Sequence, residues 1–492
     1  MTATPSTASH GFELLREQNL AEINSTARYY RHAKTGAELL SLVNSDENKV
    51  FGVSFATPPS DSTGVAHILE HSVLCGSRKY PIKEPFVELM KSSLNTFLNA
   101  MTFPDKTCYP VASQNVQDFY NLIDVYLDAV FFPRLTPQIF QQEGWHYELE
   151  TPDAPLIYKG VVFNEMKGNY SSPDTMLREL SQQSLYPDIT YGVDSGGDPK
   201  HIPDLTYEEF KAFHERHYHP SNAKLFFYGD DDPEERLRLL GARLAEFSRI
   251  TVDAEVPLQP RFAASKRLAR AYAAGPSNAQ WGEHTKETML TIELDARRAG
   301  RHRERSRLGH TGAYSDRHTG RPLYKALIDS GLGQGLAGGG LDDGLRQPMF
   351  SIGLKGIDSV DADKIVRLIT DTIGTLADKG IDPLTVGSAL NTVEFHLRES
   401  NTGPFRAVSR SCCGHSDPGC TGAIHCCRSP SKGRSPPSRQ RLRAASVISK
   451  GYSGATSSTI ATEPYWSSSL TGTWQNARRG RSARGSRRCV PA

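Results

Sequence analysis

The hydrophobic patterning that a packed core requires stops at Phe405. Before it, segments of helical and strand periodicity follow one another, whereas residues 404–492 are rich in serine, arginine, glycine and cysteine and show no apolar period. This tail holds six of the eight cysteines and, from Arg406 onward, only two acidic residues. Because such a segment cannot bury an apolar face, we expect a folded body followed by a disordered basic tail.

The body mixes helices and strands without strict alternation. Alternating β-rich residues predict strands over 50–55 and 224–228. Apolar positions at helical spacing predict helices over 64–75 and 116–130, and Thr206 is placed to cap the start of a further helix. This mixture favours an α+β fold, in which helices pack on sheets as a sandwich, over a doubly wound sheet.

The chain is too long for one ordinary core, since 492 residues suggest two to four domains. Pro257 and Pro260 lie in a loop-like stretch that we expect to link two domains. Beyond it, helical periodicity returns over 362–378 and 384–397, but residues 294–320 have almost no apolar pattern. We therefore divide the chain into a first domain, a second domain and the tail: 1–250, 251–403 and 404–492.

Composition argues against several classes of protein. Lysine and arginine number 57 against 55 acidic residues, and the body is mildly acidic, so no basic field indicates nucleic acid. Only Cys75 and Cys108 precede residue 400, which does not suit a secreted protein built on disulfides. No apolar run predicts a membrane span, and the first residues resemble neither a signal nor a transit peptide. We therefore predict a cytoplasmic protein; the oligomeric state does not follow from the sequence.

One short motif carries the chemistry, His67-Ile68-Leu69-Glu70-His71. On a helix the two histidines stand on one face, about 5–6 Å apart at Cβ, and can bind one Zn²⁺ together. Glu70 shares that face and can take a proton from a water held by the zinc as this water attacks a carbonyl. The order H-x-x-E-H is typical of inverted zinc proteases and predicts a zinc metallopeptidase. The alternative is a helix that carries two ordinary histidines and one charge.

A catalytic zinc site also needs a third protein ligand and an open fourth position. Spacing alone leaves this ligand open among four candidates: Glu143, His146, Glu148 and Glu165.

Longer segments resemble the M16 family of metallopeptidases, in its presequence protease branch. The main matching stretches are HILEHSVLCGSRKYPIKEPFVELMKSSLNTFLNAMTFPDKTCYPVAS (67–113), QQEGWHYELE (141–150) and GVVFNEMKGNYSSPD (160–174). Segments at 214–230 and 321–333 extend the resemblance over most of residues 10–403. The resemblance implies M16-like α/β sandwich domains, two of them homologous, in which helices cover a sheet.

The resemblance also implies residue roles. In the family the glutamate of the NEMKG motif is the third zinc ligand, which falls here on Glu165, and the general base falls on Glu70. The strand around Asn99 and Ala100 would be an open sheet edge to which a peptide adds as an extra strand. The same resemblance implies one zinc per chain and short unfolded peptides as substrates. The charge balance and the lack of an apolar run lead us to expect neither nucleic acid nor a membrane as a partner.

Two segments depart from the family pattern. With suitable codons, a shifted frame turns parts of 294–320 and of the tail into family-like sequence, so we hypothesise that both are frameshift products. Resequencing the coding DNA tests this, and an uninterrupted frame that encodes the tail as printed would refute it. We expect a damaged second domain that has lost a strand–helix unit and exposes Leu323, Leu327 and Ile328.

The resemblance covers only the N-terminal half of the family's full-length members, whose C-terminal half closes the chamber around the site. On this ground we expect zinc binding with weak or absent peptidase activity. The alternative to an active metalloendopeptidase is therefore an inactive M16-like protein that binds zinc or peptide without turnover.

Overall fold

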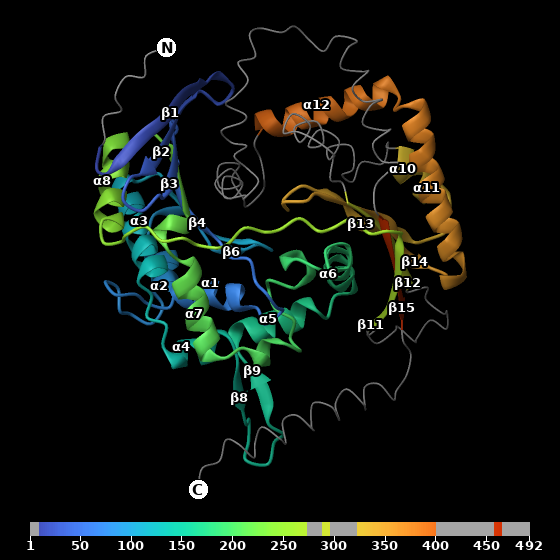
Figure 1. Cartoon of the computed structure of the whole chain (residues 1–492), viewed down its shortest axis with the longest axis horizontal. Coiled ribbons are helices and arrows are strands. Elements are labelled where there is room, and N and C mark those ends of the chain that lie inside the picture. The colour runs from blue at the N-terminus through green and yellow to red at the C-terminus, as the bar shows by residue number, and fades with distance from the viewer. Residues whose placement is uncertain (1–8, 273–287, 296–321, 400–456, 465–492) are drawn as a thin grey trace.

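The computed structural model describes residues 9–272, 288–295, 322–399 and 457–464. Two large sheets, each with helices packed against it, make up these residues (Figure 1). The mixture of helices and sheets confirms the α+β fold that the sequence predicts. Within this part of the chain, no helix has the length and apolar character that crossing a bilayer requires.

The first sheet has eight strands in the order β1-β2-β3-β10-β4-β7-β5, with β6 also paired to β7. β10 runs parallel to β3 and antiparallel to β4, so the chain returns to the middle of the sheet after a long helical excursion. The strands are β1 (Phe12–Leu20), β2 (Ser25–His32), β3 (Glu38–Val43), β4 (Lys49–Ala56), β5 (Asn95–Leu98), β6 (Met101–Thr102), β7 (Lys106–Ser113) and β10 (Ala223–Gly229).

The two faces of this sheet are buried in different cores. Along β4, Phe51, Val53 and Phe55 join the main core under the helices, while Val50 faces a smaller cluster on the opposite side. This alternation follows from the period of two along a strand. The helices are α1 (Val65–Val73), α2 (Pro85–Ser92), α3 (Val116–Phe131), α4 (Pro137–Glu143), α5 (Val161–Asn169), α6 (Pro173–Leu185), α7 (Tyr207–His217) and α8 (Pro233–Leu244). A two-stranded hairpin, β8 (His146–Glu148) with β9 (Ile157–Lys159), projects from this part of the molecule (Figure 1).

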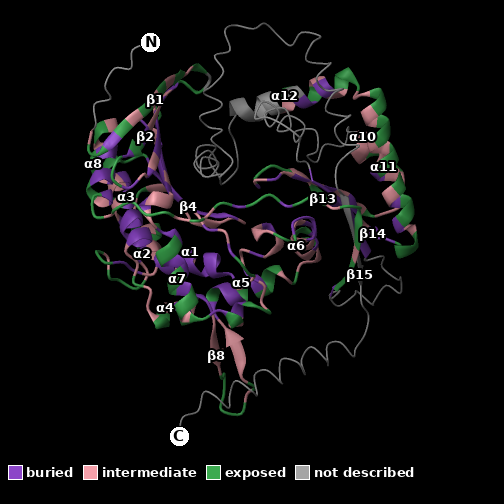
Figure 2. Cartoon of the chain, in the orientation of Figure 1, coloured by how far each residue is buried: buried purple, intermediate pink, exposed green. Residues whose placement is uncertain are grey.

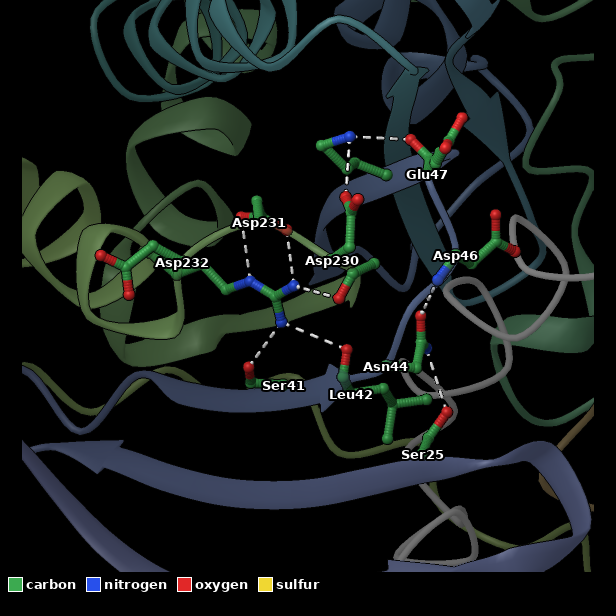
Figure 3. Close-up of polar contacts among 12 residues, drawn as sticks. Ser25, Ser41, Leu42, Asn44, Asp46, Glu47, Asp230, Asp231 and Asp232 are labelled. Atoms are coloured by element: carbon green, nitrogen blue, oxygen red, sulfur yellow. Dashed lines mark hydrogen bonds and ion pairs between the residues drawn. The ribbon is translucent and has the colours of Figure 1, made fainter.

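A fully buried arginine fastens α8 to the first sheet. The Arg236 guanidinium pairs with Asp231 through two hydrogen bonds of 2.5 and 3.0 Å. It also donates to Ser41 Oγ and to the carbonyl oxygens of Leu42 and Gly229, at 2.8, 3.2 and 2.9 Å. Figure 3 shows Asp231, Ser41 and Leu42 gathered around this group. Every donor of the buried charge therefore points to an acceptor from β3, β10 or the turn before α8.

We expect Arg236→Ala to lower the free energy of unfolding by about 3–5 kcal/mol, because it leaves the Asp231 carboxylate buried without its partner. Urea denaturation of the purified variant measures this loss. Arg238→Ala is the matched control, since Arg238 pairs with Glu235 at the surface and such pairs contribute up to about 1 kcal/mol. Equal stability of the two variants would contradict the role given to Arg236.

The second sheet has five strands in the order β11-β15-β12-β14-β13. The helices α10 and α11 pack on one of its faces, and α6 packs on the other (Figure 1). The strands are β11 (Lys266–Tyr272), β12 (Thr288–Asp295), β13 (Gly335–Asp342), β14 (Met349–Ile357) and β15 (Ser457–Pro464), and the helices are α10 (Pro322–Asp329), α11 (Ala362–Lys379) and α12 (Pro383–Glu399).

The predicted strands over 50–55 and 224–228 and the predicted helices of both parts of the body are confirmed. The cap is also confirmed, because Thr206 and Glu209 form a capping box at the start of α7. The stretch over 251–262 has no helix or strand, as a linker would. The domain limits themselves stay predictions. The predictions for residues 296–320 and for most of the tail concern residues that lie outside those the structure describes.

Two expectations are wrong. The tail is not without structure throughout, because β15 lies between β11 and β12 and pairs with both. Its sequence is short and rich in β-branched residues, so its two neighbours, rather than any apolar period of its own, determine its conformation. Leu327 is not exposed either. It is 1% exposed because α10 packs against α11, whereas Ile328 on the outer side is 52% exposed.

Candidate metal centre

The helix that carries the HxxEH motif is enclosed by protein. α1 is buried along almost its whole length, as Figure 2 shows, and His67 and Glu70 are only 9% and 7% exposed. The helix begins at Gly64, whose φ of 72° favours glycine. A Cβ at Gly64 would also lie 2.8 Å from the carbonyl oxygen of Gly196. Glycine at this position therefore allows the loop around Gly196 to lie directly against the start of α1.

Three of the predicted site residues come together. His67 Nε2 and His71 Nε2 lie 3.8 and 3.9 Å from Glu165 Oε2, and the two imidazole rings are 5.0 Å apart. Among the residues that the structure describes, this is the one group of three histidine, cysteine or acidic side chains close enough to hold a metal ion. Zinc bonds of about 2.0–2.1 Å in a tetrahedral arrangement place ligand atoms roughly 3.3–3.5 Å apart. Small side-chain movements would bring the three atoms to those separations, so the donor set fits zinc.

The second nitrogen of each histidine has its own partner. His67 Nδ1 lies 3.1 Å from the Gly196 carbonyl oxygen, and His71 Nδ1 lies 3.3 Å from Glu143 Oε2. Both partners are acceptors, so each Nδ1 carries the proton and each Nε2 keeps its lone pair for a metal. The tautomer that zinc binding needs is therefore set by hydrogen bonds already present in the protein.

Glu143 acts on His71 electrostatically as well. Burial disfavours the charged imidazole, but the hydrogen bond with Glu143 and the charges of Glu70, Glu143 and Glu165 outweigh burial and raise the pKa of His71. Burial also opposes ionisation of Glu143, yet hydrogen bonds from His71 and Gln142 lower its pKa overall. Glu143 thus remains an ionised acceptor behind His71. Burial raises the pKa of the neighbouring Cys75 thiol, which disfavours the thiolate that a metal would need.

Glu165 reaches the cluster from a second helix. The buried side of α5 consists of Val162, Phe163 and Met166, while the Glu165 side chain is 48% exposed. Gly160 precedes this helix, and a Cβ there would lie 2.1 Å from the carbonyl oxygen of Gly144. The absence of a side chain at Gly160 therefore lets α5 begin close to the end of α4, where Glu143 is located.

Glu70 lies on α1 among buried tyrosines. Burial, followed by the charges around it, raises the pKa of Tyr109, and burial with the charge of Glu70 raises that of Tyr126. Both phenols therefore stay protonated beside the carboxylate. Tyr126 uses its hydroxyl to donate to the Asn99 carbonyl oxygen at 3.3 Å.

Asn99 and Ala100 lie between β5 and β6, on the side of β7 where the sheet ends. The Asn99 amide donates to the Pro110 carbonyl at 3.3 Å, and its own carbonyl accepts from Tyr126. Both backbone groups of Asn99 thus point inward, toward β7 and α3.

The other candidate ligands are placed elsewhere. His146 and Glu148 lie on the projecting hairpin, where they contact each other at 3.4 Å and Glu148 accepts from Lys159 at 2.5 Å. Glu143 stands behind His71 rather than beside its Nε2. No sequence pattern indicated Gly196, because a backbone carbonyl 129 residues from His67 leaves no local signal.

Two family models match this chain. Residues 56–169 match the family model described as Insulinase (Peptidase family M16), and residues 204–280 match that of the Peptidase M16 inactive domain. The chain is 54% identical over 400 residues to presequence protease 1, chloroplastic/mitochondrial, of Arabidopsis thaliana, an alignment covering 80% of this chain and 37% of that protein. It is 45% identical to Protein HypA of Clostridium perfringens, over 80% and 40% of the two chains. The mitochondrial presequence protease of Xenopus laevis is 40% identical, over 81% and 39%.

Solved structures show the same fold. A protease from Helicobacter pylori superposes with a TM-score of 0.67 at 15% identity, over 88% of this chain and 98% of that one. Pitrilysin superposes with a TM-score of 0.59 at 16% identity, over 92% of this chain and 46% of that one. The chain belongs to peptidase family M16, in the presequence protease branch. It spans about two fifths of the length of the curated relatives it matches.

Proposed function

We propose that this chain is a zinc-dependent metalloendopeptidase that degrades short unfolded peptides. The observation that supports this most is the convergence of His67, His71 and Glu165, with both Nε2 atoms free to bind. The peptidase family to which the chain belongs supports the same reaction.

In this proposal the residues of α1 and α5 have two roles, metal binding and proton transfer. His67, His71 and Glu165 would hold one zinc ion, which, when bound, acts as a Lewis acid and lowers the pKa of water toward about 7. Glu70 takes a proton from the attacking water as its oxygen bonds to the scissile carbonyl carbon. When the carbon–nitrogen bond breaks, Glu70 returns this proton to the leaving amine. The same carboxylate thus accepts the proton from water and donates it to the leaving group.

Substrate binding is proposed for the edge of the first sheet. A peptide that lies beside Ala100 as an extra strand would be held by backbone hydrogen bonds, which every unfolded sequence can make. α1 packs against β6, so this edge runs next to the helix that carries Glu70. Such binding suits varied unfolded peptides and excludes folded chains, whose backbone groups are already paired.

The proposal is tested by peptide hydrolysis with and without a chelator. We expect the purified chain to cleave an unfolded peptide, to lose this activity with a zinc chelator, and to regain it when zinc is restored. A folded globular protein serves as the substrate control and should stay intact. Cleavage that a chelator leaves unchanged would contradict a metal mechanism. Zinc binding without any cleavage would favour the alternative, a protein that binds zinc or peptide without turnover.

The domain limits and the location complete the proposal. We place a boundary near residue 250, which limited proteolysis between residues 250 and 262 would test. The relatives named above include chloroplastic and mitochondrial proteins by name, while a cytoplasmic location for this chain remains our prediction. Fractionation of the native cell would test that prediction.

A further inference from the structure

We propose that Asp194 is a positioning residue that holds α1 and α5, the helices bearing the metal ligands, in their relative placement. The inference rests on the proposed function, since it matters only if His67 and Glu165 bind a metal. Asp194 lies in the loop between α6 and α7 and is 5% exposed.

One carboxylate oxygen of Asp194 is linked to α1 through the Gly196 peptide group. Asp194 Oδ1 accepts a hydrogen bond of 2.8 Å from the Gly196 amide. The Gly196 carbonyl in turn accepts from His67 Nδ1 at 3.1 Å. The carboxylate therefore fixes the peptide group whose oxygen orients the His67 ring and determines its tautomer.

The other carboxylate oxygen accepts a hydrogen bond from the end of α5. Asp194 Oδ2 accepts a hydrogen bond of 2.7 Å from the Tyr170 hydroxyl. Tyr170 is the C-cap of α5, and its amide closes the last turn by donating to the Met166 carbonyl at 2.9 Å. The helix that carries Glu165 is thus held at its end by the same carboxylate that orients His67.

The packing around this loop leaves little room for adjustment. The Asp194 amide donates to Ser62 Oγ at 3.1 Å, just before Gly64 begins α1. A Cβ on Gly196 would lie 3.0 Å from Met166 Cε on α5, and one on Gly64 would lie 2.8 Å from Gly196 O. The loop therefore contacts both helices, and the charge-assisted hydrogen bonds that the Asp194 carboxylate accepts determine its position between them.

Residues behind a metal ligand usually change metal affinity by about 10–100-fold when replaced. We expect Asp194→Ala to weaken zinc binding by about 10-fold, measured by competition with a chromogenic chelator. The absorption bands of the Co²⁺-loaded variant should shift, because the ligand geometry changes. Asp194→Asn keeps an acceptor for the Gly196 amide and should lose less affinity. Tyr170→Phe removes the α5 contact alone and should also have a smaller effect.

Asp198→Ala is the matched control in the same loop, because the Asp198 side chain accepts from the Lys200 amide. It should keep the zinc affinity and the Co²⁺ spectrum of the unaltered chain. Melting of each metal-free variant separates a loss of folding from a loss of positioning. If the variants at Asp194 fold and bind zinc as tightly as the control, with an unchanged Co²⁺ spectrum, the positioning role of Asp194 is refuted and the proposed function is unaffected. If the unaltered chain binds no zinc, the proposed function fails together with it.

Discussion

Replacing Glu70 by glutamine is expected to lower kcat/KM for peptide hydrolysis by about 10²–10⁴-fold, the usual contribution of general acid–base catalysis. Glutamine has nearly the shape of glutamate but cannot accept the proton of the attacking water. The zinc content should not change, because the metal-binding atoms belong to His67, His71 and Glu165.

Steady-state kinetics on an unfolded peptide, with zinc content measured on the same samples, tests this expectation. Glu208→Gln is a suitable control, since Glu208 is an exposed acid in the first turn of α7. It should leave both kcat/KM and zinc content unchanged. Full activity of the Glu70→Gln chain would mean that another group accepts the proton. A parallel loss of zinc would instead indicate that Glu70 shapes the metal site.

Removing the third ligand is expected to weaken zinc binding by at least about 100-fold, since even residues behind a ligand contribute up to that factor. In Glu165→Ala only the two histidines of α1 would remain, and a catalytic zinc site uses three protein ligands. Peptidase activity should be lost with the metal. The metal-free variant should nevertheless fold, because the Glu165 side chain is 48% exposed and the apolar side of α5 is unaltered.

Zinc titration by calorimetry and thermal melting of the metal-free protein measure the two effects. The matched control is Lys167→Ala, an exposed position on the same helix. It should bind zinc normally and melt as the unaltered chain does. Unchanged zinc affinity in Glu165→Ala would show that the third ligand is a different residue, and Glu143 behind His71 would then be the first to examine.

The part of the site that the sequence predicts by itself is the part within one helix. His67, Glu70 and His71 follow from spacing along α1, since residues three and four apart share a helix face. Glu165 did not follow from spacing and was predicted only by resemblance to the family. Three of the four apolar residues of its helix α5 are consecutive, Val161 to Phe163, rather than spread at helical spacing, so periodicity alone gives little sign of it.

Contacts between groups that are distant in the sequence could not be predicted at all. The Gly196 carbonyl and the Asp194 carboxylate meet α1 and α5 only because the loop folds back on both helices. In the sheets, β7 is buried on both faces along its whole length and so lacks the alternation that identifies a half-buried strand. β15 also has no apolar period of its own, and its conformation depends on the strands β11 and β12 with which it pairs. Sequence patterns thus identify single elements, while the pairing between elements comes from the tertiary structure.

The zinc content of the purified chain is the first measurement to make on the zinc site that we propose between α1 and α5. Elemental mass spectrometry after dialysis against metal-free buffer would be run on the unaltered chain beside the double variant H67A/H71A. We expect one zinc per chain in the first protein and none in the second. A folded, unaltered chain without zinc, or equal zinc in both proteins, would contradict it.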